Sequence, residues 1–496
     1  MIFLRNIFLI LITLYCFVIG ANPYYSLENA EVYSILEYQI LKKSDDIYVL
    51  NQPYKISKIQ KLLLDNENFY KYYMANNYYN QDLDDNLGVY ITPSIFLGPY
   101  NLTQNEHLSE IIFNRNSIGF SFASAMKISD FLYINEVDIN KNFKYKEDFH
   151  GDTNEWITGY FSSSYAMYES DKGFEFFAGR ISRNFGLLND YGTILSNHPY
   201  SFDHFGFSTT GSFLKYSFYT TRLNDVDGID LSGETIDVGV EENCKRFWAI
   251  QRLDYKMNDD VQFSISESIL YGGPEQQFVA SYINPINFFY ASQRNQKIQL
   301  NGFWQANLFY RIQSGVALYL DIFVDDIIVN NESEYIQRDF HPDRLGLLLK
   351  LSTSRIKDYL ISLRYVRISN ETYTSLRTFE NYTYYNNSIG FPENSYESIK
   401  LSVDYLKKLP FYCNASFDLF QKGEKDLFSP FNNQISDFPI GAVSKGILFK
   451  LKSSNFFGKI KASLNYDLLL DSGDYIDESF QHNINFSIQY YFHKLI

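Results

Sequence analysis

The stretch that decides the fold is Asn483-Ile-Asn-Phe-Ser-Ile-Gln-Tyr-Tyr-Phe492. Apolar and polar residues alternate through it, so that one face is wholly apolar and the segment ends in aromatic residues. A strand of about ten residues with this pattern is typical of a wall that has lipid on one side and water or polar protein on the other. The stretch therefore predicts the closing strand of an outer-membrane β-barrel.

The same alternation recurs in four earlier segments, at residues 318–324, 359–365, 400–406 and 460–468. The faces opposite the apolar ones carry lysine, arginine and aspartate. A dry core does not hold such charges unpaired, because each one costs several kcal/mol, whereas a polar lumen accommodates them. We therefore expect an all-β protein whose residues 86–496 form a transmembrane antiparallel β-barrel of roughly 16 to 18 strands.

The start of the sequence predicts export. A charged segment, Met1 to Arg5, precedes an apolar run to Ile19 and the small residues Gly20-Ala21. These are the three regions of a secretory signal peptide. A membrane anchor is disfavoured because the apolar run is shorter than the ~20 residues that a span requires. We expect a signal peptide at residues 1–21 and localisation in the outer membrane of a Gram-negative-type envelope.

The composition agrees with a barrel. Aromatic residues make up 18% of the chain, with 43 Tyr and 44 Phe, and barrels use such residues on lipid-facing positions and in interfacial girdles. The mean hydropathy of −0.25 and the lack of a long apolar run after residue 21 exclude a helical membrane protein. The net charge of −15 argues against nucleic acid as a partner. Expected partners are outer-membrane lipid and, during insertion, the barrel-assembly machinery.

Residues 22–85 differ from the rest of the chain. Apolar residues recur at helical spacing in residues 27–41 and again in residues 56–64, which predicts two short amphipathic helices. Their apolar faces must pack against something. The segment is therefore either a small periplasmic helical unit or a plug of the barrel.

Five long intervals separate the predicted strands, at residues 184–203, 223–243, 272–297, 327–341 and 369–395. Barrels place long loops outside the cell and short turns in the periplasm, and some long loops can fold inward to constrict the lumen. Two cysteines follow the signal peptide, Cys244 and Cys413, and their spacing leaves open whether they form a disulfide.

Catalytic and metal-binding motifs are weak. Ser196-Asn197-His198 offers the residue types of a hydrolase triad, but adjacent residues rarely converge on one site. Asp225, Asp227 and Asp230 suggest a calcium loop, yet the full ligand spacing with a distal Glu is absent. We therefore expect no enzymatic activity, no cofactor and no metal site.

Carboxylates on one predicted strand are candidates for a binding role. Asp321 and Asp325 fall on its presumed lumen face, and Asp326 follows at its end. They can bind sugar hydroxyls or make the wall rigid by pairing with lumen arginines, and pairing is the favoured interpretation. The arginines considered are Arg180, Arg311 and Arg364.

Glu267 breaks the alternation of the segment Phe263 to Tyr271. It lies on the same face as Phe263, Ile265 and Ile269, which the pattern assigns to lipid. Either a β-bulge turns its side chain to the other face, or that face is not exposed to lipid at this point.

Several segments resemble, in the same order along the chain, the signatures of Wzi-type capsule-assembly outer-membrane proteins. The first is Ala178-Gly-Arg-Ile-Ser-Arg-Asn-Phe-Gly186, followed by Thr193-Ile-Leu-Ser-Asn197. The others are Ser266-Glu-Ser-Ile-Leu-Tyr-Gly272, Ile283-Asn-Pro-Ile-Asn-Phe-Phe-Tyr290 with Gln293, and Asp321-Ile-Phe-Val-Asp-Asp-Ile327.

The resemblance implies an 18-stranded barrel, plugged by N-terminal helices, that acts as a lectin and retains capsular polysaccharide at the cell surface. With it, Arg180 and Arg183 are expected inside the barrel, paired with carboxylates such as Asp325. The alternative function is a diffusion porin for small solutes, because a barrel of this size can enclose an aqueous channel. The candidate ligand-binding or lumen-network residues are Arg180, Arg183, Asn197, Glu267, Asn284, Gln293, Asp321, Asp325 and Asp326.

Overall fold

The structure is a computed structural model of residues 1–496. It describes residues 24–43, 47–64, 66–76, 88–105, 108–112, 117–145, 149–153, 158–229, 240–284, 287–289, 300–326, 344–429, 431, 436–473 and 476–490. The predicted signal peptide and the predicted long interval at residues 327–341 lie outside these ranges.

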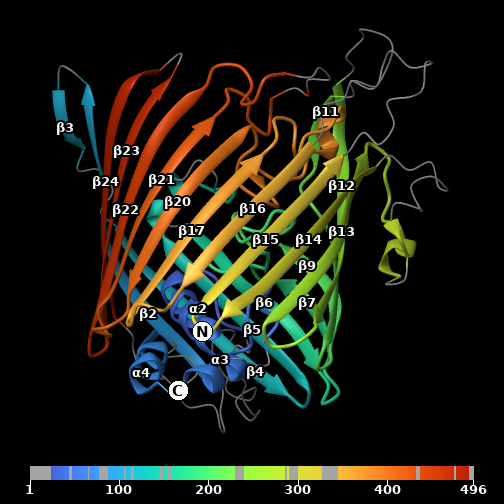
Figure 1. The fold of residues 1–496 in the computed structure, drawn as a ribbon. Helices are drawn as coiled ribbons and strands as arrows, with labels where there is room; N and C mark the ends of the chain where they lie inside the picture. Colours follow the sequence, from blue (N-terminus) through green and yellow to red (C-terminus); the bar gives the residue numbers. More distant parts are fainter. Residues whose placement is uncertain are drawn as a thin grey trace, which may run out of the picture.

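Eighteen antiparallel strands of the described chain form a closed barrel (Figure 1). In ring order they are β2 (Gly88–Asn105), β4 (Ser117–Ile128), β5 (Phe131–Asn140), β6 (Gly159–Glu169), β7 (Phe174–Arg180), β9 (Asp203–Thr210), β10 (Leu214–Arg222), β12 (Val240–Lys256), β13 (Val261–Gly273), β14 (Leu300–Gln313), β15 (Val316–Asp326), β16 (Arg344–Thr353), β17 (Tyr359–Ile368), β20 (Tyr396–Tyr405), β21 (Tyr412–Lys422), β22 (Ser444–Phe457), β23 (Ile460–Gly473) and β24 (Ile476–Tyr490). β3 (Leu108–Ile112) extends the sheet beside β2, and β11 (Val226–Ile229) continues β10 along β12. The predicted fold class and the strand number that the resemblance implies are confirmed.

The ring closes where the first and last barrel strands meet. β2 pairs with β24, for example at Ile95 and Ile488, and on its other side with β4. The segment that predicts a closing strand is thus in place up to Tyr490, and residues 491–496, which include Phe492, lie outside the described ranges.

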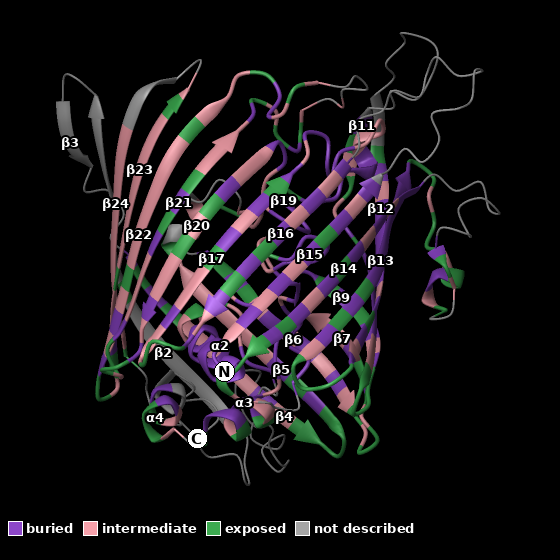
Figure 2. Cartoon of the chain, in the orientation of Figure 1, coloured by how far each residue is buried: buried purple, intermediate pink, exposed green. Residues whose placement is uncertain are grey.

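The two faces of the wall follow the predicted alternation, as the striped strands of Figure 2 show. On β17, Leu363 is 49% exposed on the outside, whereas its neighbour Arg364 is 8% exposed inside the barrel. On β20 the same holds for Leu401 outside and Asp404 inside. The outer face meets lipid, and the inner face holds the charged residues.

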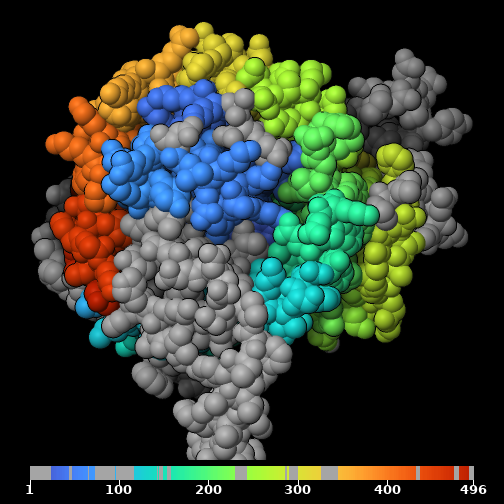
Figure 3. Space-filling view, turned by 90° about the horizontal axis from the view of Figure 1, so that it is seen from below, coloured from blue at the N-terminus to red at the C-terminus, as the bar shows by residue number. Residues whose placement is uncertain are grey.

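Three helices lie at the end of the barrel that carries the short turns. α2 (Ala30–Lys42) and α3 (Ile56–Leu63) confirm the two predicted helices, and α4 (Glu67–Asn76) was not predicted because its sequence lacks clear helical periodicity. The Gly315 amide in the turn after β14 donates to the Leu41 carbonyl (2.7 Å). Seen from below, the helices lie across this end of the barrel (Figure 3). No helix among the described residues is long and apolar enough to cross a membrane.

Buried hydrogen bonds join the segment after α2 to the inner face of β12 to β14. The Arg311 guanidinium donates to the carbonyls of Ile40 (2.7 Å) and Lys43 (2.6 Å), at the end of α2. The Arg252 guanidinium donates to the Leu50 carbonyl (3.1 Å), and the Asn51 amide to the Asp254 carboxylate (2.7 Å). The helical segment is therefore packed inside the barrel wall.

Two long loops fold into the lumen from the opposite end, as predicted for some of the long intervals. Residues 181–202, between β7 and β9, are called the first inner loop, and residues 369–395, between β17 and β20, the second inner loop. The loops join where the Ser196 amide donates to the Ile389 carbonyl (2.9 Å). A two-residue ladder, β1 (Asn51–Gln52) with β8 (Asn184–Phe185), joins the first inner loop to the helical segment. One buried hydrophobic cluster runs through all three segments.

A further segment lies on the outer face of the barrel, to the right of β13 in Figure 1. This outer strap comprises residues 274–284 and 287–289. The Phe289 amide donates to the Glu267 carboxylate (3.2 Å), and the Gln251 amide group donates to the Asn287 carbonyl (3.0 Å). The ladders of β13 with β12 and β14 have no register shift. Glu267 therefore stays on the outer face without a bulge, and it is buried because the strap covers it.

Cys244 and Cys413, the cysteines of the described chain, are not joined by a disulfide. They lie on β12 and β21, which are far apart in the ring of strands.

Candidate functional site

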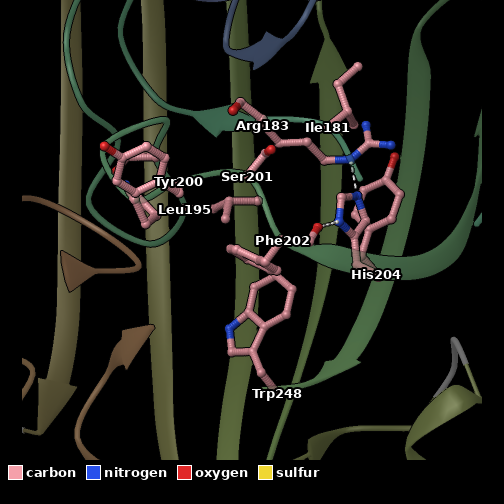
Figure 4. A pocket seen from close by; sticks show the side chains of 12 residues that line it. Ile181, Arg183, Leu195, Tyr200, Ser201, Phe202, His204 and Trp248 are labelled. Carbon is pink, nitrogen blue, oxygen red and sulfur yellow. Dashed lines mark hydrogen bonds between the residues drawn. The ribbon is translucent and has the colours of Figure 1, made fainter. Parts of the chain in front are cut away.

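The predicted residue Arg183 lies in the first inner loop, beside a small cavity of about 10 Å³ (Figure 4). Its Nε donates to His204 Nε2 (2.9 Å), and its guanidinium stacks on the Tyr219 ring at 3.9 Å. Arg183 is 5% exposed and His204 6%. A cavity of this size has room for about one water molecule. Arg183 is thus a packing residue of the lumen rather than part of an open site.

The predicted pairing of Arg180 and Arg183 with Asp325 is wrong. Arg180 donates through Nε and Nη2 to both carboxylate oxygens of Asp203, each at 3.1 Å. Asp325 instead forms an ion pair with Arg344 (3.1 Å) and accepts a hydrogen bond from the Tyr373 amide (2.8 Å). The reason is strand order, because Asp325 on β15 is next to β16, which carries Arg344, and far from β7.

Asp321 is fully buried and joins the wall to the first inner loop. Its carboxylate accepts hydrogen bonds from the Thr193 hydroxyl (2.6 Å) and from the Gln305 amide group (3.0 Å). Asp321 and Asp325 therefore hold the wall rigid, as favoured from the sequence, but the predicted partners Arg180, Arg311 and Arg364 are wrong, because these arginines pair with Asp203, Asp260 and Asp190. The backbone of the next residue, Asp326, lies opposite Arg344 in the β15–β16 ladder.

Ser196 and His198 do not form the serine–imidazole contact of a triad. The Ser196 hydroxyl donates to the Gly390 carbonyl (2.6 Å) and accepts from the backbone amide of His198 (3.1 Å). The His198 ring packs edge-on against Tyr191, with ring centres 5.4 Å apart. Asp225 forms an ion pair with Arg222 (2.6 Å), and Asp230 lies outside the described residues.

The remaining predicted residues do not come together. Asn284 is exposed at the end of the short helix η4 (Ala280–Ile283) in the outer strap, and Glu267 lies under that strap. Gln293 lies outside the described residues. Asn197 is the predicted residue that lines the interior cavity described below.

That cavity, called the lumen cleft, lies between the interior segments and the inner faces of β17, β20, β21 and β22. It has a volume of about 440 Å³, and a neighbouring cavity of about 110 Å³ shares several of its lining residues. Asn184, Asn189 and Asn197 of the first inner loop face it from one side. Tyr191 and Phe391 add aromatic side chains from the two inner loops. The cleft thus combines amides with aromatic rings, in a volume typical of small-molecule sites, roughly 300–1,000 Å³.

A buried ionic network borders the lumen cleft. Asp190 in the first inner loop accepts a hydrogen bond from Arg364 of β17 (2.7 Å) and lies 3.5 Å from the Lys350 ammonium of β16. Lys350 also contacts Glu37 of α2 (3.1 Å). Burial raises the pKa of Asp190, but the positive charges of Arg364 and Lys350 outweigh burial and hold the pKa below its ordinary value. The ionised carboxylate therefore fixes the first inner loop to the wall.

The opposite wall of the lumen cleft carries three lysines. Lys400 on β20 and Lys450 and Lys452 on β22 line it, together with Asn414 and Ser416 of the strand between them. No motif in the sequence singles out these lysines. The alternation of these lysines with apolar residues places them on the lumen face. They meet in one cavity because of the register between β20, β21 and β22, and a single sequence does not give that register.

The known proteins that this chain is similar to share its fold. No family model and no curated protein matches the sequence. Among solved structures, the chain is similar to Wzi of Escherichia coli, an outer membrane protein involved in group 1 capsule assembly and described as a carbohydrate binding β-barrel. The TM-score is 0.59 at 10% identity, and the match covers 96% of this chain and 100% of that chain. OprD of Pseudomonas aeruginosa has a TM-score of 0.45 at 9% identity, with 82% and 95% covered.

The predicted resemblance to Wzi is thus confirmed for the fold. The protein is an outer-membrane β-barrel, located in the outer membrane. At 10% identity, the likeness extends no further than this.

Proposed function

We propose that the protein binds and retains a capsule-like surface polysaccharide without catalysing a reaction, and that residues 22–85 and the inner loops act as its plug. The observation that carries the proposal is the packed interior beside a polar, aromatic cleft. Tyr373 and Tyr382 of the second inner loop are fully buried, and their hydroxyls donate to the carbonyls of Thr193 (2.7 Å) and Ile194 (2.8 Å) in the first. Such packing favours a binding site over a wide channel.

The chemistry of the lumen cleft suits sugar. The amides of Asn189 and Asn197 can exchange hydrogen bonds with hydroxyls, and the face of Tyr191 can cover the apolar side of a sugar ring. The likeness in fold to Wzi, described as a carbohydrate binding barrel, supports the same proposal. Of the predicted residues, Asn197 is placed in this site, and Arg183, Asp321 and Asp325 are proposed to hold its walls.

The test is retention of polysaccharide. Cells that lack the gene should release surface polysaccharide into the medium, and the intact gene should restore its retention. Purified protein in detergent should bind polysaccharide extracted from the same cells, as measured by biolayer interferometry. Unchanged cell-bound polysaccharide in the deletion strain, together with no binding by the purified protein, would contradict the proposal.

A diffusion porin is the second candidate. The observation that favours it is the lumen cleft itself, whose 440 Å³ adjoin a further 110 Å³ cavity along the inner faces of β17 to β22. Lysines on that wall could guide small anions. Steady conductance in a planar bilayer would favour this candidate.

A further inference from the structure

The three lysines of the lumen cleft differ from the buried cations of the barrel. Arg252, Arg311 and Lys350 each contact a carboxylate or a carbonyl. Within the described part of the chain, the ammonium groups of Lys400, Lys450 and Lys452 form no hydrogen bond and no ion pair. Lys452 is exposed in the lumen, and Lys400 and Lys450 are half-buried, so their charged groups can be reached by a ligand in the cleft.

The lysines are close enough to act together. Lys400 lies opposite Asp418 in the β20–β21 ladder, and Lys450 lies opposite Ser416 in the β21–β22 ladder. Lys452 follows two residues later on the same face as Lys450. Two strand spacings of about 4.8 Å and a register offset of two residues put the Lys400 and Lys450 backbones about 12 Å apart across β21, and Lys452 lies one further pair of residues along β22.

The acidic residues that line the lumen cleft form their ion pairs with cations other than these lysines. Asp190 and Asp418 both form ion pairs with Arg364, at 2.7 and 3.3 Å. Glu393 forms an ion pair with Lys422 (2.6 Å). Asp467 of β23 lies opposite Lys450, and Asp404 of β20 lines the neighbouring cavity, so the excess of positive charge at the cleft is small, although the whole chain has a net charge of −15.

We propose that Lys400, Lys450 and Lys452 form a subsite for carboxylate groups of acidic sugars. This deepens the proposed function, on which it rests, by naming the ligand class as uronate-type saccharides. The ammonium groups provide charge-assisted hydrogen bonds to a carboxylate. Neutral acceptors complete the site, because Asn189 Oδ1 is buried without a hydrogen-bond partner among the described residues and can accept from a sugar hydroxyl.

The experiment measures binding of trigalacturonate, maltotriose and inorganic phosphate to the full-length protein in detergent by isothermal titration calorimetry. The variant K400Q/K450Q/K452Q removes the charges, and K400R/K450R/K452R keeps them. K445Q is the matched control, because Lys445 lies on β22 but is exposed on its other face. A heat-modifiable band on gels shows that each variant is folded.

We expect trigalacturonate to bind the wild type, K445Q and the arginine variant, and to bind the glutamine variant at least 10-fold more weakly. High salt should also weaken this binding. Maltotriose affinity should be the same in all four proteins. Equal trigalacturonate affinity in the glutamine variant would overturn the proposal. Inorganic phosphate that binds as tightly as trigalacturonate would overturn the assignment to sugar carboxylates.

The outcome separates this inference from the proposed function. Wild-type protein that binds the cell's own polysaccharide but not trigalacturonate would overturn the lysine subsite and leave the proposed function standing. Lysine-dependent binding of trigalacturonate without binding of that polysaccharide would support the subsite and contradict the proposed function.

Discussion

At the scale of the residue, the closest approach of the two inner loops is at Gly390. A Cβ atom at this position would lie 2.0 Å from the Thr193 carbonyl oxygen, which is backbone and cannot move aside easily. We expect Gly390→Ala to lower the free energy of unfolding by about 1–3 kcal/mol, as overpacking does. Urea unfolding would measure this. The control is Gly302→Ala, where the nearest atom to the new Cβ is 3.8 Å away, and equal midpoints for the two variants would contradict the packing described.

The ionised Asp190 carboxylate should make the stability of the protein depend on pH in the acidic range. Because its pKa is lowered in the folded protein, its contribution to stability is present above the unfolded value of about 3.9 and is lost as the pH falls through the folded pKa. Asp190→Asn should destabilise the protein at pH 7 by roughly 1.5–3 kcal/mol, because Arg364 and Lys350 lose one buried partner and keep Asp418 and Glu37. The variant should also lose less stability than the wild type between pH 5 and pH 3, in urea unfolding at each pH. Parallel pH profiles would argue against this role.

At the scale of the element, the outer strap keeps Glu267 and Gln251 away from lipid. Replacing residues 276–288 with a short Gly-Ser linker should expose both side chains on the outer wall and reduce the assembled fraction on heat-modifiability gels. Adding Glu267→Leu to the strap deletion should restore assembly, because the exposed charge is gone. If the deletion alone assembles normally, the strap does not shield this face.

Arginine substitutions on the two faces of the closing strand β24 should have opposite effects on assembly. Phe486 pairs with Leu464 of β23 and with Leu97 of β2, on the face that alternation assigns to lipid. Phe486→Arg should cost up to about 2–4 kcal/mol and abolish most assembled protein in the outer membrane. Asn485→Arg, on the lumen face, is the control and should assemble. Similar levels of both variants would show that the strand has a different register.

The elements show what sequence patterns can and cannot predict. Alternation is a local property, so the strands, their faces and the closing role of β24 were predictable. The side-chain partners across strands were not, as the pairing of Asp325 with Arg344 of the neighbouring strand instead of Arg180 shows. The lysines on β20 and β22 likewise meet because of how these strands are aligned in the barrel. The sequence shows that Glu267 breaks the alternation of its strand. It does not show that the outer strap covers this side chain, because the path of that loop cannot be read from the sequence.

At the scale of the whole molecule, the barrel is filled from both ends. The helical segment packs at the short-turn end and the inner loops pack from the other, and one hydrophobic cluster joins them. Arginine and lysine side chains of β12 to β17 hold this interior to the wall. This packing is why a binding protein is favoured over an open pore.

The most direct test of that claim is the conductance of full-length protein in a planar lipid bilayer. We expect no steady current in 1 M KCl from the intact barrel, and a variant that lacks residues 22–85 should either conduct or fail to assemble. Stable, porin-like conductance from the full-length protein would contradict the account and make transport its function.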